Sequence, residues 1–249
     1  MKLLILAGGK GTRLQSDKFN LPKALKELNG KPLIEYVLEN TSFISKKDVY
    51  IVVGYKGEMI KEALGSEYNY ITQDKQLGTG HAVMITEKYL KDCNDDIMIL
   101  YGDMPMISRD TFEGFAEYHK ERKSMCTVLT SMFEDQPPYG RIIRDENNNF
   151  LRVVEEKDCT EEQKKIKELN CGPDIIHSSV LFDALKKVSN NNSQGEYYLT
   201  DVPEIIRDGG HVVNIYVCKN CSEMLGINTL EDLKPVSYTH LTLPTNREV

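Results

Sequence analysis

The stretch "LILAGGKGTRLQSDKFNLPKAL", residues 3 to 24, runs from an apolar segment directly into a glycine-rich, basic loop. Residues 3 to 7 are continuously apolar, which is typical of a strand buried on both faces. A glycine-rich loop after a first strand lets backbone amides approach a phosphate closely. The opening stretch therefore predicts a strand, a phosphate-binding loop and a sheet-based fold, and it leaves the chemistry open.

The hydrophobic pattern that follows alternates between short apolar runs and longer amphipathic segments. This alternation predicts an α/β fold with a mostly parallel sheet and helices packed on both faces. The expected strands are 3–7, 49–53 and 97–101, and the expected helices are 31–40, 58–65 and 80–92. In such sheets the ligand binds at the carboxyl ends of the strands. The opening loop and "YGDMP" (101–105) both follow such ends.

From about residue 124 the pattern changes to antiparallel strands. "CTVLTSMF" and "GRIIRDENNNFLRVVEEKD" predict strands joined by the turn "DENNN", followed by a short charged helix near 160–168. We expect one domain over 1–233, with a nucleotide-binding half at about 1–123 and a sugar-binding half at about 124–233. Residues 234–249 contain two prolines and no helical periodicity, so we expect an atypical tail, non-native or disordered.

The net charge of −7 over 249 residues argues against a non-specific nucleic-acid binder, which needs a broad basic surface. Any phosphate site must therefore be locally basic. Six cations and a single acid fall within residues 1–26, a pattern equally typical of a solvated basic face: Lys2, Lys10, Arg13, Lys18, Lys23 and Lys26, against Asp17.

Six scattered cysteines lack the dense spacing of a secreted disulfide scaffold, which favours a reducing cytoplasmic location. Cys218 and Cys221 form one CxxC, but no second Cys or His pair follows, so we expect two ordinary thiols. The apolar opening is too short for a signal-peptide core, and no stretch approaches a membrane span. We therefore expect no membrane association.

Two common phosphate-loop patterns do not fit the opening stretch. The dinucleotide fingerprint GxGxxG fails because Leu14 follows Gly9 and Gly11 where the last glycine is required. The P-loop fails because Lys10 precedes Gly11 and no hydroxyl follows in register. Dehydrogenase and P-loop chemistry are both disfavoured.

The opening stretch instead resembles the signature of the sugar-nucleotide pyrophosphorylases, in the motif "LAGGKGTRL" followed by Lys23 in "PKAL". Further motifs occur in the order seen in the N-acetylglucosamine-1-phosphate uridyltransferases, and specifically resemble the uridyltransferase half of the bifunctional bacterial enzyme. The resemblance covers nearly all of 1–233, and the motifs are "QDKQLGTGHAV" (73–83), "YGDMPMI" (101–107), "YGRIIRD" (139–145), "VVEEKD" (153–158), "ELNCG" (168–172), "QGEYYLTDV" (194–202) and "GIN" (226–228).

The resemblance implies a Rossmann-like nucleotidyltransferase fold and transfer of UMP from UTP to N-acetylglucosamine 1-phosphate, with Mg²⁺ as cofactor. It implies catalytic roles for Arg13 and Lys23, and magnesium ligation by Asp103 and Asn228. On "YGD" alone, an aspartate after a strand is more often a turn or cap residue than a metal ligand. The implied nucleotide-binding residues are Leu6, Ala7, Gly8, Gly9, Gly11, Gln73, Gln76, Gly78 and Thr79. The implied sugar-phosphate residues are Gly140, Glu155, Asn170, Tyr198 and Thr200. His81 is expected to pack or cap, because an ionised phosphate needs no general base.

The sequence departs from the resembled family in two places. The chain carries nothing that could form the family's β-helix, so we expect neither acetyl transfer nor the trimer, and the oligomeric state stays open. The sugar motif, usually NTG before an aromatic-rich strand, reads "NCGPDII", where Pro173 removes a ladder donor. Two alternatives remain: a nucleotidyltransferase for another sugar 1-phosphate or base, and a nucleotide-sugar-binding protein without turnover.

Overall fold

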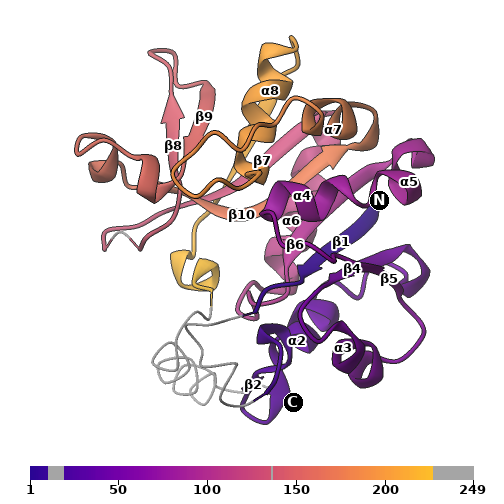
Figure 1. Ribbon diagram of the computed structural model, residues 1–249. Helices are drawn as coiled ribbons and strands as arrows, with labels where there is room; N and C mark the ends of the chain where they lie inside the picture. Colours follow the sequence, from indigo (N-terminus) through magenta and orange to yellow (C-terminus); the bar gives the residue numbers. More distant parts are fainter. Residues whose placement is uncertain (11–19, 136, 227–249) are drawn as a thin grey trace, which may run out of the picture.

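The computed structural model describes residues 1–10, 20–135 and 137–226. Within these ranges nine strands form one sheet, whose main path runs β11-β7-β10-β6-β1-β4-β5 (Figure 1). These strands are β1 (Lys2–Ala7), β4 (Val49–Val53), β5 (Asn69–Thr72), β6 (Asp96–Tyr101), β7 (Cys126–Met132), β8 (Arg141–Arg144), β9 (Phe150–Val154), β10 (Glu168–His177) and β11 (Val213–Cys218). A separate two-stranded ribbon consists of β2 (Glu27–Leu28) and β3 (Lys31–Pro32).

The described helices follow the strands they connect. The α-helices are α2 (Leu33–Asn40), α3 (Gly57–Leu64), α4 (Thr79–Met84), α5 (Glu87–Leu90), α6 (Arg109–Glu121), α7 (Ser178–Leu185) and α8 (Val202–Asp208). The 3-10 turns are η2 (Lys23–Leu25), η3 (Lys46–Asp48), η4 (Lys91–Cys93), η5 (Glu156–Asp158), η6 (Gln163–Lys165), η7 (Leu199–Asp201) and η8 (Cys221–Met224).

The centre of the sheet is the first strand of the chain. β1 pairs in parallel with β4 on one side and β6 on the other, and β5 continues the parallel set. Leu3, Leu4 and Ile5 are fully buried, because alternate side chains enter the cores on the two opposite faces. The predicted parallel strands are confirmed, and their carboxyl ends lie along one edge of the sheet.

Helices cover both faces of this sheet. One core contains Ile34 of α2, Ile60 of α3 and Phe115 of α6, together with one set of strand residues. The opposite core receives Val83 of α4, Leu181 of α7 and Ile206 of α8. Figure 1 shows α4, α7 and α8 near one another, while the β8–β9 hairpin extends away from the body. The predicted α/β class with helices on both faces is confirmed.

β10 links the parallel strands to the rest of the sheet. It runs antiparallel between β6 and β7, so its first residues lie at the edge where β6 ends. The register with β7 breaks between Asn170 and Asp174, and Gly172 within the break has φ +98°. Pro173 lies inside this β-bulge, where no ladder bond to β7 is required, so its missing N–H is tolerated.

Two sequence-based helix predictions need correction. The helix expected over 80–92 is broken into α4, α5 and η4, since Thr86 bonds its hydroxyl to the Val83 carbonyl and the chain turns there. The helix expected near 160–168 is only the turn η6, and Glu168 already begins β10. Its charged residues pair locally, as in Lys164–Glu161, and no apolar stripe binds it to the core.

Candidate active site

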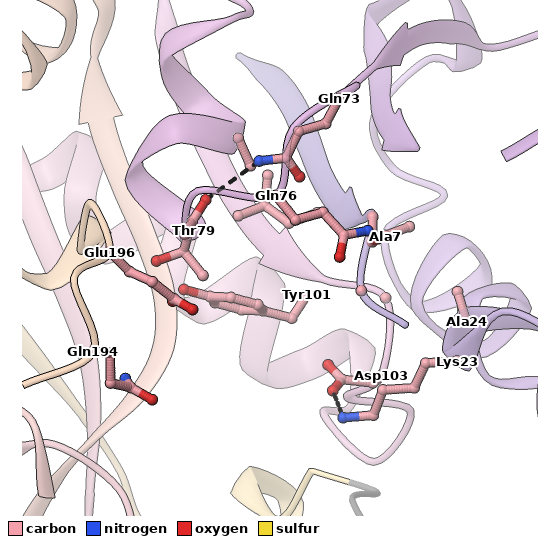
Figure 2. Close-up of a pocket in the computed structure, with 16 residues that line it drawn as sticks. Ala7, Lys23, Ala24, Gln73, Gln76, Thr79, Tyr101, Asp103, Gln194 and Glu196 are labelled. Carbon is pink, nitrogen blue, oxygen red and sulfur yellow. Dashed lines mark hydrogen bonds and ion pairs between the residues drawn. The ribbon is translucent and has the colours of Figure 1, made fainter. Parts of the chain in front are cut away.

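A cavity of about 650 Å³ opens at the carboxyl edge of the parallel strands (Figure 2). It lies where β1, β5 and β6 end, as open α/β sheets lead one to expect. Ten of the residues singled out from the sequence line it: Leu6, Ala7, Gly8, Gly9, Lys23, Gln73, Gln76, Gly78, Thr79 and Asp103. Six further residues complete the lining: Ala24, Ala82, Tyr101, Gly102, Gln194 and Glu196.

The loop after β1 is held open by a close backbone approach. The Gly8 carbonyl accepts hydrogen bonds from Gln76 Nε2 at 2.6 Å and from the Tyr55 amide at 3.3 Å. A Cβ on Gly54 would lie 2.7 Å from the same carbonyl oxygen, so only glycine fits at position 54. The sequence analysis missed Gly54, which comes after β4 and carries no phosphate-loop pattern of its own.

Gln73, just after β5, presents a fixed amide to the cavity. Its Nε2 lies 3.1 Å from His81 Nδ1 and 3.4 Å from the Gly78 carbonyl oxygen. Burial lowers the pKa of His81, which favours a neutral ring that accepts at Nδ1. Both amide hydrogens of Gln73 are thereby directed into the protein. Its Oε1, close to Gly8, is the atom left to accept a hydrogen bond from a ligand.

The segment "LGTG" is bound to the distant segment around Tyr197. The Gly80 amide donates to the Tyr197 carbonyl at 2.8 Å, and the Tyr197 amide donates to the Leu77 carbonyl at 2.9 Å. Gly78 has φ +109°, and a Cβ there would lie 2.5 Å from the Tyr197 oxygen. Thr79 Oγ1 accepts from the Leu199 amide at 3.1 Å. These contacts bring residues from both predicted halves into one wall of the cavity.

Lys23 and Asp103 form an ion pair at the other end of the cavity (Figure 2). Lys23 begins η2, and Asp103 follows β6, so segments 80 residues apart supply one charged pair. Their side chains are 18% and 24% exposed, which leaves both groups accessible to a ligand. Neighbouring Lys26 is buried, and desolvation lowers its pKa.

The donor set at Asp103 suits a hard, partly hydrated cation. The described residues contain no cluster of three or more His, Cys, Asp or Glu able to hold a metal. Mg²⁺ commonly binds through one or two carboxylates, with water and substrate phosphate completing its shell. Asp103, beside a lysine and open to the cavity, fits that requirement as one protein ligand.

Four of the five predicted sugar-phosphate residues form two hydrogen-bonded pairs, and none of the five lines the cavity itself. Thr200 donates to Glu155 Oε1 at 2.8 Å, and the Asn170 amide donates to the Gly140 carbonyl at 2.8 Å. Tyr198 accepts at its hydroxyl from Gln194 Nε2 at 2.9 Å, and Gln194 itself lines the cavity. Burial raises the pKa of Glu155, and the Thr200 hydroxyl partly offsets this effect.

Tyr101 is the central residue that the sequence analysis did not select. Figure 2 shows its ring between the Lys23–Asp103 pair and Glu196. Burial raises the pKa of its hydroxyl, and Thr79 partly offsets this effect. A Cβ on Gly172 would lie 2.8 Å from the ring, so Tyr101 packs directly on the β10 bulge. Its place at the end of a buried strand was the available signal.

Gly11, Arg13 and Asn228, three of the predicted site residues, lie outside the described residues, as does the tail 234–249. Their roles stay predictions. The described residues end at Gly226, two residues before Asn228 and shortly after η8. Glu223 of η8 accepts from the Ser108 amide at 3.0 Å, and the Gly226 amide donates to the Tyr139 hydroxyl at 2.9 Å.

Comparison with known proteins identifies the class to which this fold and cavity belong. The nucleotidyl transferase family matches residues 2–217, and the chain belongs to that family. Two solved structures have the same fold. A putative glucose-1-phosphate thymidylyltransferase from Bacillus anthracis, in complex with a sucrose, has a TM-score of 0.74 at 20% identity and covers 98% of this chain and 96% of its own. A UDP-glucose pyrophosphorylase complexed with UDP-glucose has a TM-score of 0.75 at 18% identity, covering 96% and 98%.

Closer sequence relatives are proteins named bifunctional protein GlmU. The chain is 43% identical to that of Caldanaerobacter subterraneus subsp. tengcongensis over 226 residues, which are 91% of this chain and 48% of the relative. It is 40% identical to that of Streptococcus uberis over 225 residues, 90% of this chain and 48% of the relative. The chain thus spans about half the length of these relatives, and the predicted membership of the nucleotidyltransferases is confirmed.

Proposed function

We propose that this chain transfers UMP from UTP to N-acetylglucosamine 1-phosphate and releases pyrophosphate. One observation carries the proposal: a single cavity brings a fixed base-reading amide, Gln73, together with a charged pair, Lys23 and Asp103. One predicted sugar residue, Tyr198, is hydrogen-bonded to Gln194, which lines the same cavity. The similarity to GlmU proteins over nine-tenths of this chain supports the choice of substrates.

The reaction needs charge neutralisation and alignment more than proton transfer. A phosphate oxygen of the sugar 1-phosphate, already ionised, attacks the α-phosphorus of UTP in line, and pyrophosphate leaves from the opposite side. Lys23, with Arg13 as its predicted partner, offsets the negative charge that spreads over the phosphoryl oxygens. No covalent intermediate with the protein is required.

Mg²⁺ is the proposed cofactor, with Asp103 and Asn228 as the residues that would hold it. When bound, the ion would neutralise phosphoryl charge and fix the triphosphate geometry. Asp103 already lies beside Lys23, so its carboxylate is oriented toward the phosphate end of the cavity before any substrate binds. The lysine holds this carboxylate in place, which reduces the reorganisation needed on binding.

The preference for uracil follows from the orientation of Gln73. Its Nε2 is engaged by His81 and the Gly78 carbonyl, so Oε1 faces the ligand as an acceptor. Uracil carries an N3–H donor, whereas the corresponding nitrogen of cytosine is an acceptor. With CTP, Gln73 Oε1 would face the acceptor nitrogen of cytosine, so the hydrogen bond would be lost and the two acceptors would repel each other. CTP is therefore disfavoured.

A pyrophosphate-release assay over a panel of substrates tests the proposal. UTP, CTP, dTTP and ATP are each combined with N-acetylglucosamine 1-phosphate, glucosamine 1-phosphate and glucose 1-phosphate. We expect the highest kcat/KM for UTP with N-acetylglucosamine 1-phosphate. Preference for glucose 1-phosphate or dTTP would replace this activity with another within the same family, and no release with any pair would favour binding without turnover.

Two further predictions belong with this proposal. The structure contains six free cysteines, and no described helix is long and apolar enough to cross a membrane. We place the protein in a reducing cytoplasmic compartment, because such a compartment is consistent with the free thiols.

The division into a nucleotide-binding half and a sugar-binding half also stays a prediction. Substitutions at Gln73 and Asn170 would test it through separate effects on the KM of UTP and the KM of the sugar 1-phosphate.

A further inference from the structure

The β10 bulge ends at a buried carboxyl group, one oxygen of which has no hydrogen-bond partner among the described residues. Asp174 is 2% exposed, and its Oδ1 makes no hydrogen bond within the described residues. It is directly paired with Ile99 of β6 and Val128 of β7. Because opposed residues share a face, its side chain enters the apolar core to which these two belong. A carboxylate is costly in such a place.

Among the described residues, no positive charge contributes to the pKa of Asp174. The titratable groups that interact with it are Tyr101 on β6 and Cys126 on β7, both of which burial keeps neutral. The helices on this face contribute apolar side chains: Ala82, Val83, Leu181, Phe182, Val202 and Ile206. Burial accordingly raises the pKa of Asp174 to about 8.

A group of acidic residues near the sugar side does not account for Asp174. Burial and the charges of Glu204, Glu155 and Asp158 raise the pKa of Asp201 to about 6, so these four groups interact with one another. Glu155 has its own partner in Thr200. None of these four acids contributes to the pKa of Asp174, and Asp174 does not contribute to the pKa of Asp201. Burial is the cause of the raised pKa of Asp174.

The position of Asp174 connects it to the predicted sugar site. The bulge between Asn170 and Asp174 is a stretch of β10 with no ladder partner on β7, so it can shift at lower cost than the paired backbone. Gly172 in the bulge supports the Tyr101 ring, and Asn170 before it is a predicted sugar residue. The Gly172 amide also donates to Asn170 Oδ1 at 3.3 Å.

We propose that Asp174 is a positioning residue whose neutral carboxyl keeps the β10 bulge in place under Tyr101, so that its ionisation in alkaline solution weakens binding of the sugar 1-phosphate. The proton leaves to solvent, and the resulting carboxylate moves toward water and displaces Gly172 and Asn170. The uracil contacts proposed for Gln73 and Gly78 come from the segment between β5 and α4, and neither residue is part of the bulge. Binding of UTP is therefore little affected.

The kinetic test, which rests on the proposed function, compares wild type with Asp174→Asn and Asp174→Leu at pH 7 and pH 9. For wild type we expect the KM of N-acetylglucosamine 1-phosphate to rise about tenfold, since each pH unit above the pKa reduces the protonated fraction tenfold. In both variants the KM of N-acetylglucosamine 1-phosphate should be nearly the same at pH 9 as at pH 7. The KM of UTP should change equally in all three proteins. The same rise in Asp174→Asn would overturn the proposal.

A second measurement does not depend on turnover. A folded-state pKa above the unfolded value means that the group's contribution to stability is present at low pH and is lost as pH rises toward 8. The urea midpoint of wild type should therefore fall relative to Asp174→Asn between pH 5 and pH 8, then level off. Asp48→Asn, which removes a carboxylate paired with Lys2, serves as the control and should give a constant difference above pH 6.

The two measurements separate the possible failures. A wild-type midpoint that follows Asp174→Asn at every pH would show an ordinary carboxylate and overturn the inference. Absence of turnover in all three proteins would count against the proposed function, and the urea midpoints would then decide the state of Asp174 alone. If both variants fail to fold, the wild-type KM ratio decides: a ratio near one overturns the proposal.

Discussion

At the scale of single residues, Gln73 and Asp103 divide the work that the proposed reaction requires. Gln73 is 7% exposed and has both amide hydrogens directed into the protein, which makes it a rigid acceptor. Asp103 is accessible and carries a charge beside Lys23. One residue thus suits selection of the base, and the other suits handling of the phosphates, because their surroundings fix opposite properties.

Replacing Gln73 tests its role as the acceptor. We expect Gln73→Ala to raise the KM of UTP about tenfold, since a lost buried hydrogen bond costs about 1.5 kcal/mol. The preference for UTP over CTP should shrink by a similar factor. Gln163→Ala, in the turn η6 and outside the cavity lining, is the control. Unchanged selectivity in Gln73→Ala would show that another group selects the base.

Replacing Asp103 tests the cofactor. Asp103→Asn keeps the side-chain size and removes the charge, so we expect a loss of kcat on the order of a hundredfold or more with the fold intact. The apparent affinity for Mg²⁺ in the rate assay should fall in parallel. Asp110→Asn, in the exposed first turn of α6, should retain wild-type rates. Near-normal turnover in Asp103→Asn would contradict the metal assignment.

At the scale of elements, the site depends on close contacts between backbones. Gly54 approaches Gly8, and Gly78 and Gly80 approach Tyr197, in each case nearer than a side chain would permit. These contacts join the loop after β1 to the loop after β4, and the start of α4 to the segment before η7. The cavity walls are consequently made of loops that support one another, and no single loop defines the site.

Substitution at Gly78 separates this contact from ordinary backbone strain. Gly78→Ala combines φ +109° with a Cβ 2.5 Å from the Tyr197 oxygen, so we expect a loss of about 2–3 kcal/mol in the free energy of unfolding. The KM of UTP should rise as well. Gly210→Ala has φ +89° in open space and reports strain alone. Equal losses in urea unfolding for both variants would argue against a steric role for Gly78.

At the scale of the whole molecule, one sheet joins the two predicted halves. β10 pairs with β6 from the first half and β7 from the second, and the Leu77–Tyr197 contacts link them again at the cavity. These contacts join residues before the proposed boundary near residue 123 to residues after it, and they include strand pairs in the middle of the sheet. We therefore expect that neither half keeps its core when the other unfolds. The molecule should therefore behave as one cooperative unit.

Equilibrium unfolding tests this cooperativity. We expect far-UV and near-UV circular dichroism to give coincident urea transitions, the latter reporting the 13 tyrosines. UTP with Mg²⁺ at a hundred times its Kd should raise the whole transition by about 2.7 kcal/mol. Two separated transitions, or a shift of only one part, would show that the halves fold independently.

Much of this architecture was predictable from the chain because its signals are local. Continuous apolar runs predicted β1, β4 and β6, and the turn "DENNN" predicted the β8–β9 hairpin. The helix over 160–168 was wrong because charge and spacing alone resemble a helix, while stability requires an apolar face to bury. Ten of the residues selected from the motifs line the cavity, and their roles stay predictions. Tyr101, Gln194 and Glu196 were missed as lining residues.

The sequence by itself determined the fold class and the family, since apolar periodicity and the ordered motifs are properties of the chain. Only the tertiary structure decided how these motifs meet. It directed the amide of Gln73 through His81, paired Lys23 with Asp103, and placed Tyr197 against Gly78. It also buried the Asp174 carboxyl at the edge of the β10 bulge, where Oδ1 has no hydrogen-bond partner within the part of the chain that the structure describes. The Lys23–Asp103 and Gly78–Tyr197 contacts join segments distant in sequence, and no local pattern of residues encodes such contacts.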